Sequence, residues 1–201
     1  MNIFFKIAAY LFHPLWIPTF GVALYYSVTP RFSLPEMLQS KLLVVFIITF
    51  LIPIMTFFLL KNLGVVKNIH LNEVNERKLP LIIQCILFVI LVKIVFESAY
   101  LPEVYFFFVG ALCSAITAFI LAIFKFKVSL HMIGVAGITM FLIALSIHFK
   151  INTLYTLSIL LFVNGWVASS RLHTKSHTGI ELLIGFFVGM LPQLIFVTFW
   201  L

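Results

Sequence analysis

The sequence contains no aspartate and few charged residues of any kind. Charged side chains make up 9% of the 201 residues and apolar ones 63%, whereas soluble globular proteins carry about 25% and about 45–50%, respectively. A chain with so few polar side chains cannot cover a folded surface with water-binding groups. The composition therefore predicts an integral membrane protein. It excludes a disordered chain, a nucleic-acid-binding module and a secreted disulfide scaffold.

All six acidic residues are glutamates. Membrane enzymes that hold Mg²⁺ need several carboxylates close together, so the lack of aspartate argues against prenyltransferases and alcohol phosphotransferases of the Asp-rich kind. Cysteine is also scarce. Cys85 and Cys113 both lie inside apolar runs, which is typical of small core side chains rather than of a disulfide or a redox pair.

Long apolar runs dominate the sequence, and a helix needs about 20 apolar residues to cross a bilayer. Seven runs qualify as candidates: residues 4–28, 42–60, 80–96, 104–124, 130–147, 153–169 and 180–201. They predict an all-α fold, a polytopic transmembrane helical bundle with six to seven membrane helices that form one domain over residues 1–201. The first run contains His13-Pro14 and Pro18. Because proline removes a backbone donor and disfavours helix before it, we expect this helix to be kinked or broken.

The basic residues gather in loops that we expect on one membrane face. Seven crossings put the N-terminus and residues 61–79, 125–129 and 170–179 on that face, and residues 29–41, 97–103 and 148–152 on the other. The positive-inside rule predicts that the basic face is cytoplasmic. The formal net charge of +7 then favours anionic lipid or phosphate as the partner, and not nucleic acid.

The strongest candidate site lies in residues 170–181, on the basic face. Arg171 is followed six residues later by His177, and Glu181 comes four residues after that. A spacing of four is one helical turn, so Glu181 can lie beside His177. A carboxylate that accepts one imidazole N–H fixes the tautomer and makes the other nitrogen a better nucleophile or base. We also expect His177 near a helix N-terminus, where backbone N–H groups favour phosphate.

Two further clusters lie on the same face. Ser129 and His131 stand at the start of the run 130–147 and offer a hydroxyl and a second imidazole. Arg77 and Lys78 precede the run 80–96 and supply two adjacent cations. His13 and His148 are expected to be structural.

The three clusters together resemble the motifs of the type 2 phosphatidic acid phosphatase (PAP2) superfamily. The third motif of that family is Ser-Arg, five residues, His, three residues, Asp. This sequence matches it at Ser170, Arg171 and His177, has Glu181 in the Asp position, and continues the pattern with Gly185 and Gly189. The resemblance spans residues 70 to 189.

The other two family motifs are matched more loosely. The second is usually Pro-Ser-Gly-His, and here Ser129 and His131 match it. The first is usually Lys, six residues, Arg-Pro. Arg77 and Pro80 retain it in a looser form, with His70 in the place of the Lys.

The resemblance implies a PAP2-like core and a specific chemistry. His177 would attack phosphorus and form a phosphohistidine, Glu181 would orient the imidazole, and His131 would protonate the departing alkoxide. The phosphoryl oxygens would be held by Arg171, Arg77, Lys78, Ser129 and Ser170. The resemblance implies no metal and no other cofactor. The substrate would be a phosphomonoester or diphosphate of a phospholipid or isoprenoid, in a bacterial inner (plasma) membrane.

Other interpretations stay open from the sequence. The protein is alternatively a catalytically inactive PAP2-like lipid-binding protein, or a small transporter for anionic solutes. Residues 173, 177 and 181 are spaced to bind Zn²⁺ on one helix, although Arg171 and Lys175 beside them would repel a cation. The sequence does not indicate an oligomeric state.

Overall fold

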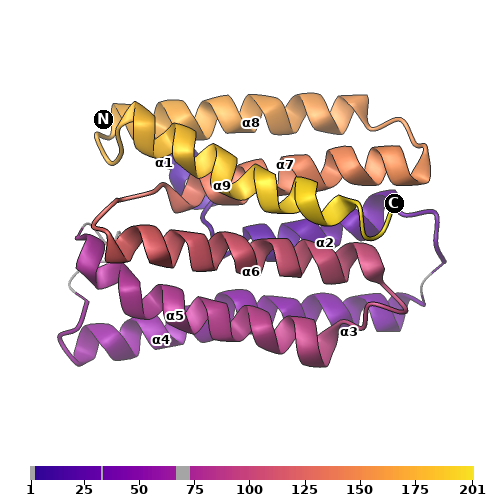
Figure 1. Cartoon of the computed structure of the whole chain (residues 1–201), viewed down its shortest axis with the longest axis horizontal. Helices are drawn as coiled ribbons and strands as arrows, with labels where there is room; N and C mark the ends of the chain where they lie inside the picture. Colours follow the sequence, from indigo (N-terminus) through magenta and orange to yellow (C-terminus); the bar gives the residue numbers. More distant parts are fainter. Residues whose placement is uncertain (1–2, 33, 67–72) are drawn as a thin grey trace.

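The computed structural model describes residues 3–32, 34–66 and 73–201, which form a bundle of helices (Figure 1). No β-strand occurs in these ranges. The described part of the chain is therefore all-α, as the apolar runs predict.

The first apolar run folds as two helices, α1 (Ile3–Leu11) and α2 (Ile17–Val28). Residues 12–16 join them and contain Pro14, whose missing N–H cannot continue the helix. Pro18 instead lies in the first turn of α2, where a helix does not use the N–H. The predicted break in the first helix is confirmed.

A long rod follows, made of α3 (Pro35–Phe46), a π-helical turn (Ile47–Leu51) and α4 (Ile52–Asn62). Pro53 has no N–H to donate to the carbonyl of Thr49, four residues earlier. The wider π-helical turn lies at this place, which is where such a loss is commonly accommodated.

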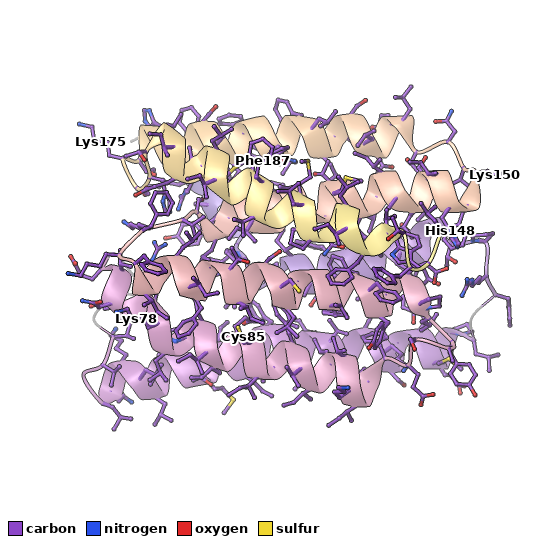
Figure 2. All side chains as sticks on the ribbon, viewed as in Figure 1. Lys78, Cys85, His148, Lys150, Lys175 and Phe187 are labelled. Carbon is purple, nitrogen blue, oxygen red and sulfur yellow. The ribbon has the colours of Figure 1, made fainter. Side chains whose placement is uncertain are left out.

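The remaining helices run alternately between two ends of the bundle (Figure 1). They are α5 (Val74–Ile90), which continues as a π-helical turn (Leu91–Val95), α6 (Pro102–Ile123), α7 (Leu130–Phe149), α8 (Leu154–His173) and α9 (Gly179–Val197). The start of α1, the start of α5, residues 124–129 and residues 174–178 share one end, which we call the basic end. Figure 2 shows Lys78 and Lys175 there, and His148 and Lys150 at the opposite end.

Five helices of the described chain are long and apolar enough to cross a membrane, which marks the protein as an integral membrane protein. These are Pro35–Asn62, Val74–Val95, Pro102–Ile123, Leu130–Phe149 and Gly179–Val197. The predicted count of six to seven is not matched. The first run is divided into two short helices, and α8 carries polar residues such as Asn164 and Arg171 that lower its mean hydropathy.

Helix α7 packs against α2, α6, α8 and α9, and its closest packing is with α9. A Cβ atom at Gly189 would lie 2.1 Å from the carbonyl oxygen of Ile133, and one at Gly185 would lie 2.9 Å from that of Ser129. Only glycine permits this approach of two backbones. As a result, the two helix starts meet, and the Ser129 N–H donates to the Glu181 carbonyl at 3.3 Å.

A buried carboxylate joins several elements at the opposite end. Glu103, in the first turn of α6, is fully buried. Its Oε1 lies 2.6 Å from Arg31 Nη2 and 3.2 Å from His148 Nε2, while Tyr25 donates to its Oε2 at 3.3 Å. Glu103 therefore connects α2, the α2–α3 loop, α6 and α7.

Candidate active site

The predicted pair of His177 and Glu181 forms at the start of α9. Thr178 is the N-cap: its hydroxyl accepts from the Glu181 N–H at 3.3 Å, and its N–H donates to Glu181 Oε2 at 3.0 Å. The same Oε2 lies 2.9 Å from His177 Nδ1. One carboxylate oxygen thus both caps the helix and holds the imidazole.

The contacts of His177 identify its tautomer. Its Nδ1 also lies 3.1 Å from the carbonyl oxygen of Lys127. The carbonyl can only accept a hydrogen bond, and an ionised Glu181 also only accepts, so Nδ1 carries the proton. The other ring nitrogen, Nε2, consequently keeps its lone pair and is the atom available for nucleophilic or basic chemistry.

The surroundings of His177 keep it neutral at physiological pH. Burial and the positive charge of Arg77 lower the pKa of His177 from 6.5 to about 4, and the hydrogen bond to Glu181 works in the opposite direction. Burial and Arg77 also lower the pKa of Lys127. Arg77 is itself buried and donates from Nη1 to the Val128 carbonyl at 2.9 Å, which fixes α5 against the loop before α7.

A cavity of about 870 Å³ brings the charged groups of the basic end together. Its lining includes four of the predicted site residues, Arg77, His131, Arg171 and His177. They come from α5, α7, α8 and the α8–α9 connection. These four residues, which are far apart in sequence, therefore line one cavity, and their roles in catalysis and phosphate binding stay predictions.

His131 is the second predicted histidine and lines the cavity from the first turn of α7. Its Nε2 lies 3.1 Å from the carbonyl oxygen of Ala9, which can only accept, so this nitrogen carries a proton and Nδ1 is the site that takes up or releases one. The ring of His13 lies 5.4 Å from that of His131, between centroids. The positive charge of Arg171 is close enough to act on His131.

Arg171 is buried, with 9% of its surface exposed, and lines the cavity. Within the described part of the chain its Nε has no hydrogen-bond partner. A buried guanidinium whose donor is unsatisfied is costly, and an anion in the cavity would satisfy it. No negatively charged side chain is among the residues that line this cavity in the described ranges.

Three predicted phosphate-binding residues lie outside the cavity lining. Ser129 is the N-cap of α7, where its hydroxyl accepts from the Met132 N–H at 3.4 Å. Ser170 donates to the Phe5 carbonyl at 2.6 Å, which joins α8 to α1. Lys78 lies at the basic end (Figure 2). Their roles in phosphate binding stay predictions, and His70 of the first motif lies outside the described residues.

Several lining residues were not selected by the sequence reasoning. The cavity is also bordered at the basic end by Lys6, His13, Lys127, Thr174 and Ser176. The signal for His13 was its place beside Pro14, since a polar residue at a helix break inside an apolar run tends to face a cavity. Lys127 lies four residues before His131 and directly precedes the four residues of the second motif.

The zinc alternative lacks a site in the described residues, where no three His, Cys, Asp or Glu side chains lie close enough together to hold a metal ion. His173 is exposed, and its ring stacks on Phe5 with 4.5 Å between centroids.

Comparisons with protein-family models, with curated proteins and with solved structures find no match for this chain. The site combines a neutral imidazole held by a carboxylate, a second imidazole and several cations around one cavity in a membrane protein.

Proposed function

We propose that this protein is a lipid-phosphate phosphatase of the PAP2 type, which hydrolyses a phosphomonoester or diphosphate of a phospholipid or isoprenoid through a phosphohistidine. One observation carries the proposal: the Nδ1 of His177 is held by Glu181, and His177 lines a cavity bordered by Arg77 and Arg171. A neutral, oriented imidazole beside fixed cations is suited to attack a phosphoryl group.

In the first step, His177 Nε2 attacks phosphorus and the P–O bond to the lipid breaks. His131 takes up a proton at Nδ1 when the anionic phosphate is bound beside it and gives this proton to the departing alkoxide, so the lipid leaves as an alcohol. Arg171, Arg77 and Lys127 balance the charge on the phosphoryl oxygens, and this positioning and charge stabilisation make up most of the catalysis of phosphoryl transfer. Glu181 stabilises the positive charge that develops on the His177 ring.

In the second step, a water molecule attacks phosphorus and the P–N bond to His177 breaks. His131, now neutral at Nδ1, accepts the proton of the water. Inorganic phosphate leaves, and both histidines return to their starting protonation states. The cationic side chains stay in place throughout, so no reorganisation is needed between the steps.

The membrane placement is also part of the proposal. The basic end would face the cytoplasm of a bacterial cell, with the protein in the plasma membrane. A lipid phosphate lies at the membrane interface, which is the level at which helix ends and their loops meet the headgroups. This suits a site built from helix starts and loops.

The test is release of inorganic phosphate by the purified protein from a panel of lipid phosphates, in the presence of EDTA. We expect the wild-type protein to release phosphate and His177→Ala to be reduced to background, because the nucleophile is lost. His173→Ala is the matched control, since His173 is exposed and lies four residues earlier in the same segment. It should retain the wild-type rate.

A folded His177→Ala protein with full activity would contradict the proposal. So would a wild-type protein that retains lipid phosphates without releasing phosphate from any of them, which would support the inactive lipid-binding alternative. A phosphorylated His177, trapped by rapid acid-free quenching and located by mass spectrometry, would identify the intermediate directly.

A further inference from the structure

The cavity extends well beyond the basic end. Its lining continues from Arg77 to Phe88 on α5, and its deepest part also includes Phe107 and Gln193. Phe88 comes eleven residues after Arg77 on the same helix, which is about 16 Å at 1.5 Å per residue. The hydrocarbon core of a bilayer is about 30 Å thick. The cavity therefore reaches about as deep as one leaflet.

Small side chains on α6 make room for this deep part. Ala111, Ser114, Ala115 and Ala118 all line the cavity. Their spacing of three, one and three residues places them on one face of the helix. Opposite them, Gly134 and Gly137 of α7 also line the cavity. A stripe without large side chains leaves a channel between the helices.

The polar groups in the deep part are already satisfied within the protein. Ser114 donates to the carbonyl oxygens of Gly110 at 3.0 Å and of Val188 at 2.9 Å. Gln193 donates to the Phe107 carbonyl at 3.0 Å. The deep part therefore offers mainly apolar surface to an occupant.

The basic end differs, because the Nε of Arg171 is buried and without a partner among the described residues. Gln84, two turns after Arg77 on α5, also lines the cavity. One cavity thus has a polar part near the basic end and an apolar part below it. These two parts match the polar headgroup and the apolar tail of an amphiphile.

The cavity also has a path to the surrounding bilayer. An apolar surface groove of about 670 Å³ runs along α1 and the connection to α2. It shares Lys6, Tyr10 and Trp16 with the cavity. Tyr10 is exposed, with 64% of its surface accessible. A hydrocarbon chain in the membrane can therefore reach the cavity from the side, without leaving the apolar phase.

We propose that the cavity binds one membrane lipid with its phosphate at the basic end and a hydrocarbon chain, about one leaflet in length, along the small face of α6. The position of the phosphate rests on the proposed function. The cavity then selects lipid phosphates by chain length, and short, water-soluble phosphate esters bind weakly because they leave the deep part unfilled.

The experiment measures binding of two alkylphosphonates, hexadecylphosphonate and hexylphosphonate, to the full protein in lipid nanodiscs. A C–P bond is not hydrolysed by phosphoryl transfer, so binding is read without turnover. We expect the wild-type protein to prefer the long chain at least tenfold. Ala111→Phe, which fills the deep part, should remove this preference. Ile116→Phe is the matched control, because Ile116 lies on the exposed face of α6 and outside the cavity lining.

Equal chain-length preference in Ala111→Phe and the wild type would overturn the inference, as would a loss of preference in Ile116→Phe alone. Ala111→Val, a smaller change, should give an intermediate preference and guards against misfolding of the larger variant. Selective binding of the long chain without phosphate release from any lipid phosphate would leave this inference standing and overturn the phosphatase. Phosphate release with no chain-length preference in binding would overturn this inference and leave the phosphatase standing.

Discussion

At the scale of single residues, the central feature is the pair of acceptors around His177 Nδ1. Glu181 Oε2 and the Lys127 carbonyl both face this nitrogen, at 2.9 Å and 3.1 Å. Two acceptors hold one proton, so the ring cannot rotate or change tautomer without losing both contacts. Burial and Arg77 keep the ring neutral, and Glu181 keeps it oriented.

This environment predicts a shifted titration of His177. Because burial and Arg77 lower its pKa to about 4, the ring stays neutral at pH 5, where an ordinary histidine is protonated. As pH falls through about 4, the ring gains a proton and loses its nucleophilicity. We expect the rate of His177 modification by diethyl pyrocarbonate, followed by mass spectrometry, to fall to half in that range. Glu181→Gln should move the midpoint lower still, since the carboxylate favours the charged ring.

A midpoint near the ordinary histidine pKa of about 6.5 would show that His177 is solvated and that the buried arrangement does not persist in the membrane.

At the scale of elements, α9 carries the site and α7 positions it. Gly185 and Gly189, which continue the pattern of the third motif in the sequence, are the positions at which the two backbones approach. If these two positions no longer packed closely against α7, the start of α9 would move. His177 would then move away from Lys127 and Ser129. The accuracy of the site therefore depends on contacts up to three helical turns away.

Gly189→Ala tests this dependence. Its new Cβ would lie 2.1 Å from the Ile133 carbonyl, so the helices must separate, at a cost of about 1–3 kcal/mol for overpacking. We expect a lower melting temperature in detergent and a lower rate of phosphate release.

The control is Gly165→Ala in α8, where a Cβ meets nothing within 4 Å. Alanine favours helix by about 1 kcal/mol over glycine, so this variant should be as stable as the wild type or more so. If both variants melt together with the wild type, the close approach of α7 and α9 does not exist in solution.

The sequence predicts the elements well because apolar runs and proline positions act locally. Pro14 breaks the first helix, and loops alternate between the two ends as expected (Figure 1). The predicted count of six to seven membrane helices is not matched, in part because it treated the first run as one crossing. Pro14 predicts a break in that run, but the sequence does not show that the pieces have 9 and 12 residues, each too short to cross alone.

At the scale of the whole molecule, the two ends of the bundle differ in structure. The basic end holds the cavity with its cations, whereas the opposite end is closed by Glu103 and its contacts with Arg31, His148 and Tyr25. A single fully buried carboxylate there joins segments more than a hundred residues apart in sequence.

Glu103→Gln should therefore lower stability and leave the chemistry intact. Hydrogen bonds to a charged group contribute about 1.5–3 kcal/mol, so we expect a lower melting temperature with an unchanged kcat for phosphate release. Glu97→Gln, at an exposed position near the same end, is the control and should behave as the wild type. A loss of kcat that is not accompanied by lower stability would place Glu103 in the chemistry instead.

The candidate site was predictable only in part, because some of its contacts lie within one helical turn and others join segments that are distant in sequence. His177 and Glu181 are four residues apart, so one helical turn brings them together whatever the tertiary fold. The hydroxyls of Ser129 and Ser170 are instead used by neighbouring backbone groups, which no local pattern reveals. The cavity depends on small residues of α6 that resemble ordinary helix-packing positions in sequence.

The N-cap at Thr178 has a consequence for biosynthesis. Glu181 Oε2 accepts both the Thr178 N–H that starts α9 and the proton of His177 Nδ1. The imidazole is therefore oriented only when α9, the last helix in the described chain, has formed. On the proposed function, a nascent chain emerging from the ribosome would remain inert towards lipids until α9 had been inserted.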